Sequence, residues 1–219
     1  MKTLFRSILL SIALTAAVAA PAAVPGILSA TWSGSQIIPD NNASGVAFTF
    51  NIAAGEPLAI NNVEVSLNIA GGWNGDLYAY LSHGSGFSVL LNRLGRTTGN
   101  SAGSGVSGLN LTLSDSYPTD IHTAANNPLT GNFAPDGRFV SPFTAVNTDP
   151  RTAFLSSFNN LDPNGDWTLF FADVSPIAVS SIRSWTVNLG VVAVPEPGSL
   201  ALLGVAALLG WARRGGSPR

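Results

Sequence analysis

GDWTLFFAD at residues 165–173 and IRSWTVNL at residues 182–189 decide the fold class of this 219-residue chain. Large apolar residues occupy every second position in both stretches: Trp167, Leu169, Phe171, Trp185, Val187 and Leu189. Successive side chains of a β-strand point to opposite faces of its sheet. This period of two therefore predicts strands with one buried face and one face in water.

The same alternation recurs earlier in the chain. It covers four further stretches: 46–52, 63–69, 77–81 and 109–113. Glycine, proline and asparagine separate them, most clearly at 71–75 and 162–166, and no convincing helical period exceeds two turns. Many short strands joined by such turns predict an all-β antiparallel sandwich or barrel. Segment 118–152 is rich in proline and asparagine, and we expect one or two short strands in it, near residues 138–143.

The N-terminus has the organisation of a secretory signal peptide. Lys2 and Arg6 precede a short apolar core at residues 8–18, and alanines follow with A-x-A spacing. The core is apolar all round, which disfavours an amphipathic helix of the mature protein. We therefore predict that residues 1–23 are a signal peptide, with cleavage near residues 19–23.

The C-terminus has a second transport-like segment. Residues 194–199 read VPEPGS, residues 200–211 are apolar, and Arg213 and Arg214 follow. An untilted helix needs about 20 apolar residues to cross a bilayer, so this run gives a marginal span at best. Arginines next to Trp211 suit the cytoplasmic interface, which would place residues 24–193 outside the membrane.

This C-terminal segment resembles the PEP-CTERM sorting signal of Gram-negative bacteria, which is processed by the membrane protease exosortase. The resemblance rests on the Pro-Glu-Pro triplet, the short apolar helix and the arginine cluster of residues 194–219. It implies that Pro195, Glu196 and Pro197 are the recognised residues. The alternative is a plain anchor with a stiff linker, but an anchor helix alone would normally be longer.

The charge of the chain excludes some partners. The net charge is −2 and only 10% of residues are charged. Between residues 24 and 194, five arginines face eleven acidic residues, and there is no lysine. Such an acidic segment lacks the basic patch that nucleic-acid binding requires. The chain contains no cysteine, which excludes disulfides and thiolate chemistry.

The order of motifs in residues 57–189 resembles the P/Homo B domain of subtilisin-like proprotein convertases. The resemblance is carried by residues 75–77, 165–169 and 182–189, whereas residues 81–84 depart from the family pattern. It implies a jelly-roll-like antiparallel β-sandwich at 24–193, here flanked by an N-terminal signal helix and a short C-terminal apolar helix. In the convertases this domain follows a catalytic domain and supports its folding, but no catalytic domain is recognisable here. A serine endopeptidase label could thus be inherited without the residues that perform the reaction.

Catalytic motifs are weak in this sequence. Residues 99–103 formally match G-x-S-x-G around Ser101, but that motif functions at a strand-to-helix turn of an α/β sheet. His83 and His122 both lie in turn-like contexts. The sequence therefore predicts no catalytic residues and no enzyme activity.

Two candidate binding features remain. Asp162, Asn164 and Asp166 offer oxygen ligands at alternate positions, as the start of a calcium loop does, and Asp76 and Asp173 would add to them if the strand ends meet. The alternative is an Asx-rich turn that closes on itself. Trp73, flanked by glycines, is a candidate for stacking on sugar rings, although it could equally cover the end of the sandwich.

Taken together, these features predict an exported, non-catalytic cell-surface or extracellular-matrix protein. Its expected partners are an exosortase-type protease and exopolysaccharide, with transient membrane contact through the C-terminal helix. Calcium is the metal ion for which the sequence offers a candidate set of ligands, at residues 162–166. Two alternatives stay open: an accessory module of a subtilisin-like protease, and a calcium-dependent carbohydrate-binding module.

Overall fold

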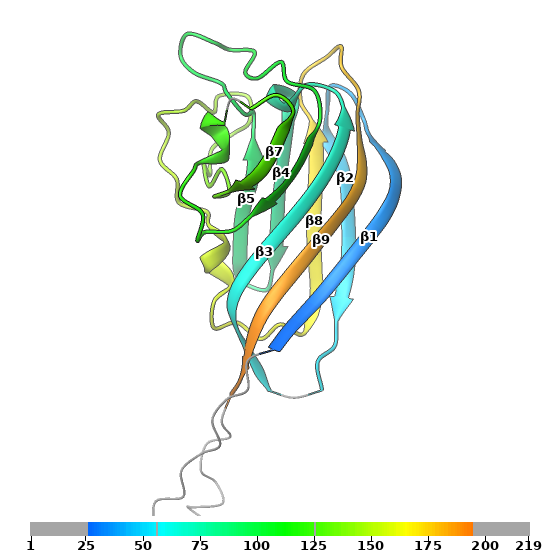
Figure 1. Ribbon diagram of the computed structural model, residues 1–219, viewed down its shortest axis with the longest axis vertical. Coiled ribbons are helices and arrows are strands. Elements are labelled where there is room, and N and C mark those ends of the chain that lie inside the picture. The colour runs from blue at the N-terminus through cyan, green and yellow to red at the C-terminus, as the bar shows by residue number, and fades with distance from the viewer. Residues whose placement is uncertain (1–25, 56, 125, 195–219) are drawn as a thin grey trace, which may run out of the picture. The chain divides into compact units, whose positions relative to one another are not determined.

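The computed structural model describes residues 26–55, 57–124 and 126–194, which form two facing β-sheets (Figure 1). The five-stranded sheet has the order β1-β9-β3-β6-β7, with β1 Gly26–Ile38, β9 Ser180–Ala193, β3 Leu58–Gly71, β6 Leu109–Leu113 and β7 Leu129–Phe133. The four-stranded sheet has the order β2-β8-β4-β5, with β2 Asn42–Ile52, β8 Gly165–Asp173, β4 Leu77–His83 and β5 Gly86–Asn92. Paired strands are antiparallel except β6 and β7, which are parallel. The prediction of an all-β, two-sheet architecture is confirmed.

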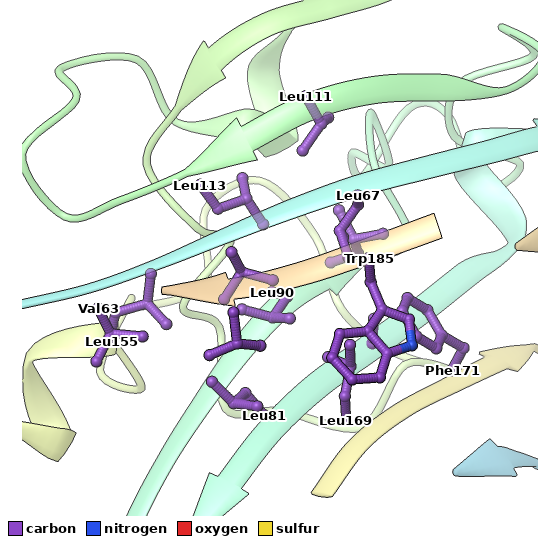
Figure 2. Packing of buried hydrophobic residues seen from close by; sticks show 14 of the residues in the cluster. Val63, Leu67, Leu81, Leu90, Leu111, Leu113, Leu155, Leu169, Phe171 and Trp185 are labelled. Carbon is purple, nitrogen blue, oxygen red and sulfur yellow. The ribbon is translucent and has the colours of Figure 1, made fainter. Parts of the chain in front are cut away.

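The core lies between the two sheets. Figure 2 shows Leu67 of β3 and Trp185 of β9 on one side, facing Leu169 and Phe171 of β8 on the other. The alternating residues of β8 and β9 are 4% exposed or less, so the period-two pattern places them in the core as predicted. Trp167 is completely buried and stacks on His83, with ring centroids 4.2 Å apart.

Strand β9 runs from one end of the sandwich to the other. Its last residue, Ala193, pairs with Leu58, and its first residue, Ser180, pairs with Ile38 and Gly71. At the Ala193 end, Gly26 of β1 pairs with Val191 of β9. The start of β1 and the end of β9 therefore lie at the same end of the sandwich (Figure 1).

Segment 118–152 differs from the expectation in one respect. Its strand is β7 at Leu129–Phe133, whereas residues 138–143 form only a single bridge, between Arg138 and Arg151. The expectation of a strand at 138–143 is wrong because its polar groups bond to other partners: the Asn92 side-chain amide donates to the carbonyl oxygens of Arg138 and Val140. Three 3₁₀ turns complete the fold: η1 Asn74–Asp76, η2 Ile121–Thr123 and η3 Leu155–Phe158.

The predicted signal helix and C-terminal apolar helix lie outside the described residues. Within the described part of the chain, no helix has the length and apolar character needed to cross a membrane.

Candidate functional site

The turn at residues 162–166 is held by internal hydrogen bonds. Asp162 Oδ1 accepts from the backbone N–H and the side-chain amide of Asn164, at 2.9 and 2.7 Å. Asn164 Oδ1 in turn accepts from the Ala54 N–H, and Asp166 Oδ1 accepts from the Asn51 amide. Each of the three predicted calcium ligands therefore already uses a side-chain oxygen in a hydrogen bond, within the turn or with residues 51 and 54.

His83 fastens this turn from the neighbouring strand β4. Its Nδ1 lies 2.9 Å from the carbonyl oxygen of Asp166, and its Nε2 lies 2.8 Å from that of Asp162. Both ring nitrogens face acceptors, so the ring ties the two ends of the turn to the face of Trp167. In the described ranges, no group of three or more His, Cys, Asp or Glu side chains has a metal-holding arrangement. The calcium prediction at residues 162–166 remains a prediction.

Asp76 and Asp173 do not join this turn. Asp173 ends β8 and pairs with Leu77, whereas Asp166 lies near the start of the same strand. The two groups of acids are therefore at opposite ends of β8. Trp73 precedes η1 and is 41% exposed, so its ring is partly accessible to a ligand.

A buried charged network that the sequence analysis missed surrounds η2. His122 Nδ1 donates to Asp136 Oδ2 at 2.7 Å, and both side chains are fully buried. Arg138 donates to Asp136 Oδ1 at 3.2 Å and to Asp120 Oδ2 at 2.8 Å. Arg151 approaches Asp120 to 3.7 Å. In the sequence these residues appear only as two separate triplets, Asp-x-His at 120–122 and Asp-x-Arg at 136–138. They form a network because the chain between them folds back and brings the two triplets together.

The surroundings of His122 favour the form of the ring that carries a proton on each nitrogen. Its Nε2 lies 2.9 Å from the carbonyl oxygen of Arg96, so both nitrogens face acceptors. Burial alone lowers the pKa of His122, but the hydrogen bond and charge of Asp136, with the Arg96 carbonyl, raise it further than burial lowers it. The net direction is a pKa above the ordinary 6.5.

A hollow of about 470 Å³ lies beside this network. Its lining includes His122, Asn100, Ser104, Thr123 and Asn147, and it does not include Ser101. A serine nucleophile needs a histidine nitrogen that is free to accept its proton. Because both nitrogens of His122 are already bonded, the hollow lacks the base that the G-x-S-x-G match would require.

The protonation of His122 gives a direct prediction. We expect NMR titration of the His122 ring to yield a pKa above 6.5, and Asp136→Asn to lower that pKa. Since the folded pKa is raised, the stabilising contribution of the imidazolium is complete below about pH 6.5 and is lost as the pH rises through the folded value. His83 is the only other histidine, so a His83→Gln variant assigns the two signals. A His122 pKa below 6.5 would contradict the network as described.

Strand β9 leads directly into the C-terminal motif. Residues 193–215 match the family model of the PEP-CTERM protein-sorting motif. The sorting motif begins at Ala193, the last residue of β9, and includes Pro195, Glu196, Pro197, Arg213 and Arg214. This confirms the resemblance of the C-terminus. The sorting motif implies export and sorting by the membrane protease exosortase, with surface localisation in a Gram-negative bacterium.

Beyond the sorting motif the comparisons are distant. A chain from the solved complex of the Aeromonas sobria serine protease with its chaperone aligns with 80% of this chain, at 16% identity and a TM-score of 0.42. The alignment covers 28% of that chain, so this protein spans less than a third of its length. No curated protein matches the chain.

Proposed function

We propose that this chain is an exported, non-catalytic surface or matrix protein whose β-sandwich is displayed and whose C-terminal segment is processed by an exosortase-type protease. The sorting motif carries the proposal, because it starts where β9 ends and leaves the whole sandwich on its N-terminal side. The hydrogen bonding of His83 and His122 supports a non-catalytic role, since neither ring has a nitrogen free to serve as a general base.

The position of the chain ends also supports this proposal. β1 begins at Gly26 and β9 ends at Ala193, at one end of the sandwich. Signal-peptide removal near residues 19–23 and processing near residues 195–197 would both leave the described strands, residues 26–193, intact. The core residues of the described ranges would all be retained, so the displayed sandwich is expected to keep its stability.

Replacing Pro195, Glu196 and Pro197 together with alanine tests the sorting step. In cells that contain exosortase, we expect the processed form to fall at least about tenfold and the full-length form to accumulate in the membrane fraction. Wild-type protein in an exosortase-deletion strain should behave in the same way. Trp73→Ala is the matched control, because it alters the sandwich surface and leaves the sorting motif intact. Normal processing and location of the triple variant would overturn the proposal.

We further infer that the sandwich is of the P/Homo B type and that it contacts exopolysaccharide after export. Two of the three stretches that resemble the P/Homo B domain, residues 165–169 and 182–189, lie in β8 and β9, which are inner strands of the two sheets. The partly exposed ring of Trp73 supports the contact with sugar. Co-sedimentation of the protein with purified exopolysaccharide tests this contact, which Trp73→Ala should weaken. Unchanged co-sedimentation of the variant would exclude Trp73 as the contact.

A further inference from the structure

Two buried carboxylates lie at the end of the sandwich opposite the 162–166 turn. Asp76 closes η1 just before β4, and Asp173 is the last residue of β8, where it pairs with Leu77. Asp76 is 2% exposed and Asp173 is fully buried. The Val174 N–H donates to the Asp76 carbonyl oxygen, so the backbones of the two acids are tied together.

Each of these carboxylates keeps one oxygen without a partner. Asp173 Oδ1 accepts from the Ser175 N–H at 3.3 Å, and Asp76 Oδ1 lies 3.9 Å from an Arg93 guanidinium nitrogen. In the described residues, Oδ2 of Asp76 and Oδ2 of Asp173 are both buried and have no hydrogen-bond donor. Buried polar atoms are nearly always bonded, and an unpaired buried charge is costly, so both atoms lack a ligand that would satisfy them.

The charges around the pair do not cancel. Burial raises the pKa of Asp76, and burial together with the charges of Asp76 and Asp40 raises the pKa of Asp173 to about 6. The groups that act on the pair are Ser175, Asp40 and Arg93: the Ser175 hydroxyl lowers the pKa of Asp76, and the Ser175 backbone N–H lowers that of Asp173. The Arg93 pKa is itself lowered by burial and by Arg96. Three carboxylates thus face one nearby guanidinium. With all three carboxylates ionised, the group carries two net negative charges, which matches one divalent cation.

We propose that Asp76 and Asp173 bind a divalent cation, for which Ca²⁺ is the best fit. Carboxylate oxygens are hard ligands, and Ca²⁺ accepts irregular shells of six to eight oxygens, whereas Mg²⁺ requires a near-ideal octahedron. Two carboxylates supply the charged ligands, and water and backbone oxygens complete the shell. Asp40, which is exposed, contributes its charge from outside the shell. This proposal is independent of the proposed sorting and display function.

Thermal unfolding of the protein recovered from exporting cells tests the site at pH 7.5. Extracellular calcium modules bind with dissociation constants of about 10⁻⁴–10⁻³ M. We therefore expect 10 mM CaCl₂ to raise the Tm by about 5 °C relative to EGTA, and MgCl₂ to raise it less.

Three variants locate the effect. Asp173→Asn should abolish the calcium shift, and in EGTA it should be at least as stable as the wild type, since it buries no charge. Asp166→Asn, in the 162–166 turn, is the matched control and should keep the full shift. Asp40→Asn should move the calcium titration midpoint to a concentration several-fold higher. Because Asp40 is exposed, this variant will fold even if Asp173→Asn does not.

The proposal is overturned if wild-type protein shows no calcium shift at pH 7.5. It is also overturned if Asp173→Asn retains the shift, or if Asp166→Asn loses it. Where Asp173→Asn cannot be prepared, an unchanged calcium midpoint in Asp40→Asn overturns the proposal.

Discussion

Trp167→Ala is expected to lower the free energy of unfolding by about 3–5 kcal/mol, as removal of a fully buried tryptophan does in other cores. Trp167 is 0% exposed, and its ring stacks on His83 and packs against Phe158, with centroids 4.2 and 5.1 Å away. Its indole Nε1–H also donates to the Pro163 carbonyl oxygen at 3.0 Å. The substitution therefore leaves a cavity and an unpaired acceptor and removes the surface on which His83 rests.

Trp73→Ala is the control for this prediction. Trp73 is 41% exposed, so its loss should cost about 1 kcal/mol or less. Urea unfolding measures both variants, with the transition midpoint moving at an unchanged slope. Equal effects of the two substitutions would show that Trp167 does not anchor the core in the way that its burial indicates.

Asp136→Asn is expected to destabilise the fold by about 3–5 kcal/mol at pH 6, since breaking a buried ion pair leaves an uncompensated charge. Asp136 is the acceptor for both His122 and Arg138, at 2.7 and 3.2 Å. The substitution keeps the shape of the side chain but removes the charge that offsets these two cations. Asparagine can still accept one hydrogen bond, so the loss of stability reports mainly the charge.

A double-mutant cycle separates this pair from the rest of the network. His122→Gln removes the buried imidazolium, so adding it to Asp136→Asn should cost less than the sum of the two single substitutions. We expect a coupling energy of at least about 1 kcal/mol, measured by urea unfolding at pH 6. Strict additivity would show that Asp136 acts through Arg138 alone.

The sequence predicted the strands whose two faces differ and missed those whose faces do not. β8 and β9 have one face in the core, which produces a clear period of two. β5 is almost wholly buried, because segment 134–158 covers its outer side, so its residues do not alternate. In β1 the less exposed positions stay in phase, but residues 28, 30 and 32 are only half-buried and residues 33–36 interrupt the apolar run, which hides the strand.

The candidate sites were harder to predict than the strands, because most of them are formed by residues that are far apart in the sequence. The sorting motif is a continuous segment, and the sequence alone was enough to find it. The network of His122 and Asp136 joins residues from two loops, and the pair of Asp76 and Asp173 joins residues almost a hundred positions apart. The spacing of residues in the sequence does not show which distant residues meet in the fold. The 162–166 turn was predicted as a calcium site because its oxygen-bearing side chains occupy alternate positions, although those oxygens already accept hydrogen bonds from within the turn and from residues 51 and 54.

The course of β9 has a mechanical consequence for a protein held by its C-terminus. A pull applied at Val194 along the strand acts on the C-terminal end of β9, and β9 is hydrogen-bonded on both sides, to β1 and β3, for nearly all of its length. When the opposing force acts on the loops near Ser180, the ladder bonds lie across the direction of pull and share the load together. A surface protein fastened in this way resists shear from the surrounding fluid through many bonds at once, without opening them one by one.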